Sequence, residues 1–298
     1  MSHNTASVDV LILGCGYLGR RAAAEWIRRG KTVAALTRSR SHELAAAGIT
    51  PIPGDVCDAS TLVNLPNAKT VLYAIGLDRG AGHSMRDVYV YGLTDALDAM
   101  PKDHRLIYVS STSVYGQTDG DWVDECSPTE PLEESGRVVL DAEATLIARR
   151  PDAIRLRFAG IYGPGRLLRE KAIVNGEPLG GDPDKWLNLI HVDDGVQAVL
   201  DAEANAQPGD LYLVADDEPV TRRDFYTHLA AGLQAPRPGF DGAPSNRETH
   251  RRIRNTLMKN RLGVDLHYPD YRRGLDRILA ATRRDLQSVG TSPDSGSP

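Results

Sequence analysis

The sequence GCGYLG at residues 14–19 constrains the fold of this chain more than any other segment. The apolar residues 10–13 precede it without alternation, as in a central parallel strand, and residues 18–27 after it have helical periodicity. In such a dinucleotide-binding turn, the first glycine allows the tight turn, the second lets the backbone approach a pyrophosphate, and the third lets helix and strand pack closely. The N–H groups that open the helix would then face the phosphates. The turn therefore supplies these candidate cofactor contacts: Gly14, Gly16, Tyr17, Leu18 and Gly19.

The end of the next predicted strand, residues 32–37, indicates which cofactor is preferred. NAD-specific sites usually place an acidic residue about 20 residues after the glycine turn, whereas an arginine there accommodates the 2′-phosphate of NADP. This strand is followed by Arg38 and Ser39 and by no acid. A hydrogen bond from guanidinium to phosphate gives about a tenfold to hundredfold preference. We expect NADP(H) to be favoured over NAD(H); the alternative is an exposed basic turn that contacts no ligand.

Three further strands are predicted at residues 49–55, 69–76 and 105–111. Asp55, at the end of the first, is expected at the adenine end of the cofactor, and the segment Ala74, Ile75 and Gly76 lets a cofactor lie close. Residues 110–113 (SSTS) are unusually polar for a buried strand end, which indicates a site at the carboxyl edge of a sheet. Strands that alternate with helices predict an α/β fold with a Rossmann-type doubly wound parallel sheet.

In the second half of the chain the predicted strands and helices alternate less regularly. Thr221 is a plausible N-cap, with Asp224 three residues later. Residues 117–134 form a long acidic loop that we expect to lie over the site. We divide the chain into a Rossmann region (1–165), a smaller substrate-facing lobe (166–282) and a disordered tail (283–298), because the residues from 287 on are polar and rich in Gly, Pro and Ser. Helices are predicted at 83–100, 136–150, 194–204, 221–233 and 271–282, and strands at 152–161, 187–192 and 210–215.

The composition argues against several classes of partner. The formal net charge of -5 gives no electrostatic case for binding nucleic acid or an anionic membrane, and no apolar run approaches the length of a spanning helix. We expect a cytoplasmic protein, since the first residues lack a signal pattern. The three cysteines, Cys15, Cys57 and Cys126, have no metal-ligand spacing, so they are expected to be reduced thiols and no metal site is predicted. Oxidation of Cys15 could block cofactor binding, although a small residue in a tight turn is the simpler interpretation.

Several motifs occur together in order: GCGYLG at 14, SSTSVYG at 110, LRFAGIYGPGR at 156, NLIHVDD at 188 and LYLVADDEP at 211. With these motifs the chain resembles the extended short-chain dehydrogenase/reductase superfamily, often labelled NAD-dependent epimerase/dehydratase, over residues 8–282. It is most similar to the atypical YeeZ-like branch, also in SNRETHRRIRNTLMKNRLGV and YPDYRRGL near the C-terminus. The resemblance implies an NAD(P)-dependent oxidoreductase or epimerase, and a homodimer through the helices at 84–100 and 136–150.

The resemblance also implies a catalytic set, which is only partly present. The serine on the fifth strand is Ser111, expected to hydrogen-bond a substrate carbonyl or hydroxyl, with a serine that merely closes a strand as the alternative. The family's Tyr and Lys of YxxxK fall on Ser135 and Val139, and its helix Asn falls on Tyr89. Losing a positioned acid/base costs ~10²–10⁴-fold in rate. Tyr115 is a candidate substitute for the missing acid, although the case for it is weaker than the case for Ser111 as a hydrogen-bond donor. Further candidates are Tyr162, Tyr89 and Tyr91, with Arg137 as a cation. Each of these side chains is expected to pack in the protein rather than to take part in catalysis.

Two functions from different classes follow from these residues. The first is an NADP-favouring oxidoreductase or epimerase acting on a hydroxyl or carbonyl group, with a nucleotide-linked sugar as one candidate substrate. The second is a catalytically impaired NADP(H)-binding sensor or regulatory protein, because the glycine turn and Arg38 are present while YxxxK is absent. His191 and Asp193 resemble a structural feature more than a general base. The substrate is not identified by any motif.

Overall fold

The computed structural model describes residues 7–242 and 248–289, and its centre is a parallel sheet of seven strands in the order β11-β7-β5-β4-β1-β2-β3. This is the doubly wound Rossmann-type sheet that the alternating pattern predicts. The order reverses between β1 and β4, so the crevice outside their carboxyl ends is where such sheets bind ligands. The strands are β1 Val8–Leu13, β2 Val33–Thr37, β3 Thr50–Pro53, β4 Ala68–Tyr73, β5 Arg105–Ser111, β7 Ile154–Phe158 and β11 Leu211–Val214.

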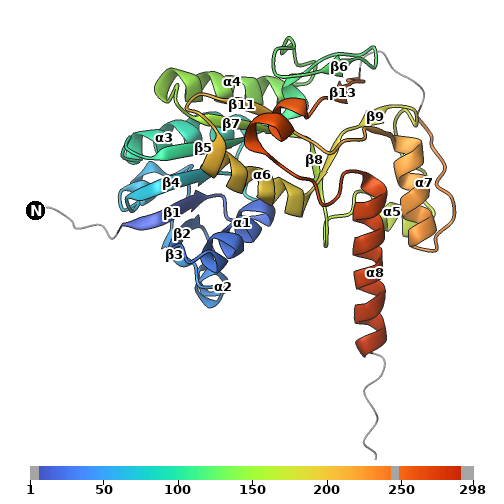
Figure 1. Cartoon of the computed structure of the whole chain (residues 1–298), viewed down its shortest axis with the longest axis horizontal. Coiled ribbons are helices and arrows are strands. Elements are labelled where there is room, and N and C mark those ends of the chain that lie inside the picture. Colours follow the sequence, from blue (N-terminus) through green and yellow to red (C-terminus); the bar gives the residue numbers. More distant parts are fainter. Residues whose placement is uncertain (1–6, 243–247, 290–298) are drawn as a thin grey trace, which may run out of the picture.

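Helices cover both faces of this sheet (Figure 1). One apolar core lies between the sheet and α1 and α6, and a second lies between the sheet and α3 and α4. Tyr91 and Ile147 remain exposed on the second face, and dimerisation through those helices stays a prediction. The helices around the sheet are α1 Tyr17–Arg28, α2 Ser41–Ala46, α3 Gly92–Ala99, α4 Glu134–Arg149 and α6 Val192–Asn205, with short turns of helix at Ala59–Leu62 (η1), Asp87–Tyr91 (η2, a π-helical turn), Thr112–Val114 (η3) and Met258–Leu262 (η4, a π-helical turn).

A smaller core lies beyond the carboxyl end of the sheet, where Tyr162 and Phe225 pack with residues of α5, α7 and α8. Thr221 caps α7 as predicted, since its Oγ1 accepts a hydrogen bond from the Asp224 N–H at 3.1 Å. The division at residue 165 stays a prediction. Two elements of the second half belong to the central layer structure, since β11 is a strand of the sheet and α6 packs against it. The remaining elements are α5 Glu170–Val174, α7 Arg222–Gly232, α8 Tyr271–Val289, β6 Trp122–Val123, β8 Gly160–Tyr162, β9 Trp186–Leu187, β10 Leu189–His191, β12 Val220–Thr221 and β13 Arg252–Ile253.

Several predicted boundaries were wrong for identifiable reasons. The strand expected at 152–161 is two strands, because Ala159 donates its N–H to Val214 while Gly160 donates to Asn188, so the chain changes partners there. The helix expected from residue 83 begins after Ser84, whose side chain and N–H exchange hydrogen bonds with Asp87. The last helix continues to Val289, past the predicted end at residue 282, while residues 290–298 of the predicted tail lie outside the described residues.

The acidic segment 117–134 is not simply a loop over the site. Its strand β6 pairs in parallel with β13 of the C-terminal segment, and His250 exchanges main-chain hydrogen bonds with Gln117 and Gly120. None of residues 117–134, all of which are described, lines the cavity discussed below. The segment therefore joins the C-terminal part of the chain to the fold.

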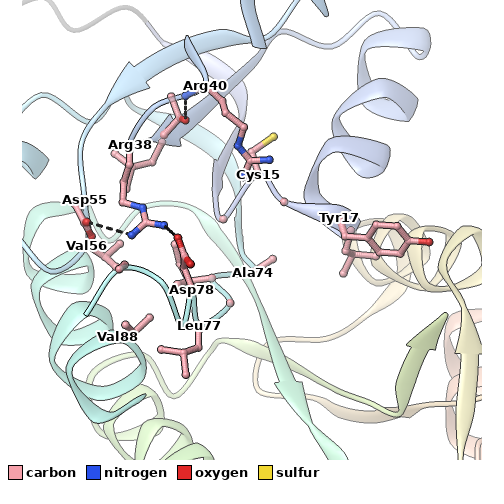
Figure 2. A pocket seen from close by; sticks show the side chains of 18 of the residues that line it. Cys15, Tyr17, Arg38, Arg40, Asp55, Val56, Ala74, Leu77, Asp78 and Val88 are labelled. Atoms are coloured by element: carbon pink, nitrogen blue, oxygen red, sulfur yellow. Dashed lines mark hydrogen bonds and ion pairs between the residues drawn. The ribbon is translucent and has the colours of Figure 1, made fainter. Parts of the chain in front are cut away.

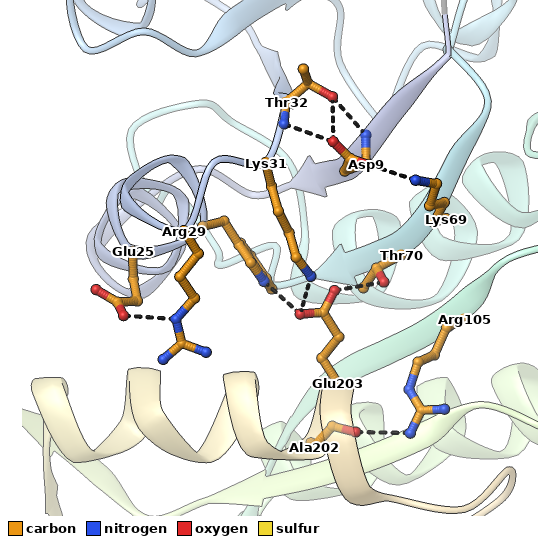
Figure 3. A network of polar contacts seen from close by, with 11 residues as sticks. Asp9, Glu25, Arg29, Lys31, Thr32, Lys69, Thr70, Arg105, Ala202 and Glu203 are labelled. Carbon is orange, nitrogen blue, oxygen red and sulfur yellow. Dashed lines mark hydrogen bonds and ion pairs between the residues drawn. The ribbon is translucent and has the colours of Figure 1, made fainter.

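A polar network at the amino ends of the strands joins the two halves of the chain (Figure 3). The half-buried Glu203 of α6 accepts hydrogen bonds from Trp26 Nε1, Lys31 Nζ and Thr70 Oγ1, each at 2.8 Å. Burial alone would raise the pKa of Glu203, but these three donors outweigh it and the pKa is lowered. Glu203 thus fixes α6 against α1 and β4, at the edge of the sheet opposite the cavity.

Among residues 7–242 and 248–289, no helix is both long enough and apolar enough to cross a membrane.

Candidate functional site

The glycine turn is crowded on one side and open on the other. Gly14 has φ +98°, and a Cβ there would lie 2.3 Å from the main-chain carbonyl carbon of Ala74, directly after the neighbouring strand β4. A Cβ on Gly16 would meet no protein atom within 4 Å, so the backbone there borders free space. This is the cradle that a pyrophosphate needs, and the residues present therefore fit a dinucleotide.

The first turn of α1 opens onto the same space. Gly16 is the N-cap and offers no side chain to the helix, and no acidic residue lies in the first turn. The first N–H groups of an α-helix have no partner within the helix, and the helix dipole adds positive potential at this end. The start of α1 is consequently suited to an anion such as a phosphate.

A cavity of about 470 Å³ extends from this turn across the carboxyl ends of β1, β2 and β4 (Figure 2). Every cofactor contact proposed from the sequence lines it except Gly19, whose Cβ would instead lie 2.5 Å from the Gly14 carbonyl oxygen, consistent with a helix-packing role. The predicted residues that the structure brings together here are Gly14, Gly16, Tyr17, Leu18, Arg38, Ser39, Asp55, Ala74, Ile75 and Gly76.

The end of the cavity beside β2 carries charges of both signs. Arg38 Nη2 donates a hydrogen bond to Asp78 Oδ2 at 2.6 Å, and Arg38 Nη1 lies 3.9 Å from Asp55 Oδ2. Figure 2 shows the guanidinium between the two carboxylates. Sequence reasoning found Arg38 and Asp55 but missed Asp78, which lies in the loop after β4 and reaches Arg38 across 40 positions of the chain.

The other end of the cavity is closed by the turn after β8. Tyr17 Oη donates to the Pro164 carbonyl at 3.0 Å, and the Arg21 and Arg166 guanidinium carbons lie 4.1 and 5.3 Å from the centre of the Tyr17 ring. Burial raises the pKa of Tyr17, against the opposing effect of the two arginines. Arg166 also lines the cavity; the sequence analysis included it in a family motif but did not name it as a site residue.

Ser111 ends β5 and is half-buried; it does not line the cavity itself, although Val109 of the same strand does. Its Oγ accepts a hydrogen bond from the Ser113 N–H at 3.1 Å, and in the described part of the chain the hydroxyl hydrogen has no acceptor, so it can be donated to a substrate oxygen. Arg251 of the C-terminal segment holds the following turn, since its Nη2 donates to the Thr112 carbonyl at 2.6 Å. Burial lowers the pKa of Arg251 to about 10. This contact was not anticipated from the sequence.

The positions that correspond to YxxxK lie at the start of α4, which packs on the turn after Ser111. A Cβ on Gly136 would lie 2.4 Å from the Ser113 carbonyl oxygen. Ser135 beside it is half-buried and donates to Glu133 Oε2 at 3.3 Å, while Val139 is buried in an apolar cluster with Val114 and other residues. The place of the family's lysine is therefore part of the hydrophobic core.

The tyrosines proposed as substitutes lie in different surroundings. Tyr115 is fully buried, and its hydroxyl donates to the Asp124 carbonyl at 2.9 Å and accepts from Arg157 Nη1 at 2.7 Å. Burial raises the pKa of Tyr115, although Arg157 opposes it. Tyr115 does not line the cavity, and its hydroxyl is committed within the protein, which is a structural position rather than that of an exposed acid.

None of the remaining candidates lines the cavity. Tyr89 accepts a hydrogen bond from the Leu77 N–H at 3.0 Å, at the border of the cavity. Tyr162 packs in the smaller core, where a Cβ on Gly274 would lie 2.0 Å from its hydroxyl, and Tyr91 is exposed. Arg137 donates to the Leu132 carbonyl at 2.7 Å on the surface of α4.

His191 and its neighbours have structural positions, in line with the sequence interpretation. His191 is buried and caps α6, accepting a hydrogen bond at Nδ1 from the Asp193 N–H at 3.3 Å. Burial lowers its pKa to about 4, with Asp193 opposing the shift. The adjacent Asp194, which the sequence reasoning did not single out, accepts from the N–H groups of His267 and Tyr268, at 2.9 Å each, and so anchors the C-terminal segment.

Cys15 lies inside the glycine turn and is buried. Burial raises the pKa of its thiol to about 11, although Arg20 and Arg40 oppose the shift. Because the thiolate is the reactive form, a buried thiol with a raised pKa is inert.

Known proteins are similar to this chain over most of its length. It is 28% identical over 273 residues to Protein YeeZ of Escherichia coli K12, a match that covers 88% of this chain and 96% of YeeZ. A solved structure from Methylobacillus flagellatus, provisionally assigned as an NAD-dependent epimerase/dehydratase, is 32% identical with a TM-score of 0.75 and covers 93% of this chain and 99% of that one. The structure of MoeE5 in complex with UDP-glucose and NAD is 26% identical with a TM-score of 0.74, covering 93% and 99%.

The sequence profile of one family matches most of this chain. It describes the NAD dependent epimerase/dehydratase family and matches residues 10–215, which include the glycine turn, Arg38, Ser111 and the central sheet except the first two residues of β1. The chain therefore belongs to the NAD dependent epimerase/dehydratase family.

Proposed function

We propose that this protein is an NADP(H)-favouring oxidoreductase or epimerase that acts on a hydroxyl or carbonyl group, with a nucleotide-linked sugar as the candidate substrate. The observation that carries the proposal is the cavity at the switch point of the sheet, which joins the open side of Gly16 to Arg38. MoeE5, with its UDP-glucose and NAD, supports the candidate substrate class.

The preference for NADP(H) rests on the end of β2. This strand ends at Thr37 and is followed by Arg38, Ser39 and Arg40, all exposed, so the residues directly after β2 include no acid to accept a ribose hydroxyl. In the described part of the chain Arg40 forms no ion pair, which leaves a second cation beside the first. A 2′-phosphate would lie against these guanidinium groups, while the start of α1 would take the pyrophosphate.

The proposed chemistry follows from Ser111, which ends β5 two residues after Val109, a residue that lines the cavity. A bound nicotinamide ring supplies or accepts the hydride. Ser111 Oγ donates its free hydrogen to the substrate oxygen and so orients the reacting carbon, while the Ser113 N–H fixes the position of Oγ. Ser135 and Val139 cannot move a proton as the Tyr–Lys pair of the family does, so turnover is expected to be ~10²–10⁴-fold slower than with that pair.

The sensor hypothesis is not favoured, because the matching family is one of epimerases and dehydratases. The homodimer and the cytoplasmic location expected from the sequence remain part of the proposal.

The test is to titrate NADPH and NADH into the intact protein and into Arg38→Ala. We expect Arg38→Ala to lower the affinity for NADPH by about tenfold to a hundredfold and to leave that for NADH unchanged. Arg86→Ala is the matched control, since Arg86 forms an ion pair of similar exposure with Asp141 outside the cavity. NADPH binding that is as tight in Arg38→Ala as in the parent would contradict the assignment.

A further inference from the structure

Asp78 is held so that its carboxylate meets Arg38. Oδ1 accepts a hydrogen bond from the Gly80 N–H at 3.0 Å within the same turn, and Oδ2 accepts from Arg38 Nη2 at 2.6 Å. The Gly80 N–H, with Arg38 second, lowers the pKa of Asp78, so the group is ionised at neutral pH. Figure 2 shows the side chain at the rim of the cavity, directed at the guanidinium.

Arg38 is thereby paired on both sides. Asp55 approaches Nη1 at 3.9 Å from the loop after β3, and Asp78 bonds Nη2 from the loop after β4. The charge of the cation that would receive a 2′-phosphate is consequently offset within the protein, and a phosphate that takes the Nη2 N–H has to displace Asp78. With NAD(H), by contrast, no displacement is needed.

We propose that Asp78 is a specificity-determining residue, which sets the ratio of NADP(H) to NAD(H) affinity by competing with the 2′-phosphate for Arg38. The inference rests on the proposed function in one respect, that the adenosine ribose lies at the end of β2. An acid on β2 usually accepts the ribose hydroxyl in NAD-specific sites. Here Asp78 brings a carboxylate to the same place from the loop after β4. The site therefore holds Arg38 for the 2′-phosphate of NADP(H) and Asp78 for the ribose hydroxyl of NAD(H).

The size of the effect follows from exposure. The side chains of Arg38 and Asp78 are 43% and 55% exposed, and ion pairs of that exposure are weak. The 2′-phosphate is therefore still expected to bind Arg38 in place of the carboxylate. The resulting gain in NADPH affinity is smaller than it would be if Arg38 had no carboxylate partner. Removing the charge of Asp78 is expected to raise NADPH affinity by about two- to fivefold.

Two variants separate the charge of Asp78 from its hydrogen-bonding capacity. Asp78→Asn keeps an acceptor and the shape of the turn, so we expect tighter NADPH binding with NADH affinity unchanged. Asp78→Ala removes the acceptor as well, so we expect tighter NADPH binding together with weaker NADH binding. Asp119→Asn is the matched control, because Asp119 makes the same contact with an N–H two residues on (Asp121, 3.2 Å) and does not line the cavity.

The experiment is calorimetric titration of NADPH and NADH into the parent, Asp78→Asn, Arg38→Ala and the double variant at one ionic strength. If Asp78 competes for Arg38, the gain from Asp78→Asn disappears in the Arg38→Ala background. If Asp78→Asn still raises the NADPH affinity in the Arg38→Ala background, Asp78 acts by simple repulsion of the phosphate, and the proposed competition for Arg38 is overturned. An unchanged ratio of the two affinities in Asp78→Asn overturns the inference while the proposed function stands, whereas a parent that binds neither cofactor overturns both.

Discussion

Two regions lie at the carboxyl edge of the same sheet: the end of the cavity beside β2 and the neighbouring region around Ser111. Following the proposed function we call them the adenosine end and the catalytic end, and they differ in what they retain. At the adenosine end, the glycine turn, the open space at Gly16 and a cation after β2 are all in place. At the catalytic end, Ser111 is present, but the position of the family's lysine holds Val139, which is packed in the core. In the proposed function the fold therefore keeps the cavity for the cofactor, while a residue that packs in the core takes the place of the family's lysine.

The first prediction tests whether the catalytic end still acts. Ser111→Ala is expected to lower turnover by about 10²–10⁴-fold, a loss of the size found for a removed catalytic group, with no change in NADPH affinity. The measurement is NADPH oxidation against a panel of carbonyl compounds and sugar nucleotides. Ser113→Ala is the control, since it keeps the main-chain N–H that bonds Ser111 Oγ. Equal turnover in Ser111→Ala and the parent would give Ser111 a purely structural role.

The second prediction tests whether the catalytic end has become core. Val139→Lys places a charge in the apolar cluster around Val114 and Tyr115, so we expect a loss of about 3 kcal/mol or more in the free energy of unfolding. Urea denaturation measures it. Val139→Met carries a linear chain of similar length without the charge and should cost less. If Lys and Met are tolerated equally, the cluster is open enough to hold the family's lysine and the comparison fails.

These two ends also show how far the sequence could predict the molecule. The parallel sheet, the glycine turn and the bounds of β5 follow from local patterns, because apolar runs and glycines act over a few residues. Asp78 and Arg251 could not be found in that way, since their importance depends on Arg38 and on the Thr112 carbonyl, which are distant in the chain. Two-residue strands such as β6 and β13 form only because they pair with each other, so neither has a recognisable strand pattern in its own sequence.

The third and smallest prediction concerns the sheet on which both the adenosine end and the catalytic end lie. It tests whether Glu203 stabilises this sheet at the amino ends of the strands, opposite the cavity. The pKa of Glu203 is lowered in the folded protein, so its contribution to stability is present above its ordinary value of about 4.3 and is lost as the pH falls from there through the folded value. Glu203→Gln should lower stability by about 1–2 kcal/mol at pH 7 and flatten this part of the pH dependence. The measurement is Tm against pH.

Glu43→Gln is the control for that series, because Glu43 is exposed and lies 3.6 Å from Arg20 in a pair of little expected value. A pH profile of Glu203→Gln that matches the parent would mean that the network at the far edge adds nothing to stability.

The central claim is that the glycine turn holds the pyrophosphate of a nicotinamide dinucleotide, and titration calorimetry of NADPH into the parent and into Gly16→Ala tests it most directly. A Cβ at Gly16 meets no protein atom within 4 Å, so this variant should fold with an unchanged Tm and yet bind NADPH at least tenfold more weakly, about 1.4 kcal/mol. Gly239→Ala, equally open but outside the cavity, should bind like the parent. Equal NADPH affinity in the parent and Gly16→Ala, or no binding by the parent, would contradict the account.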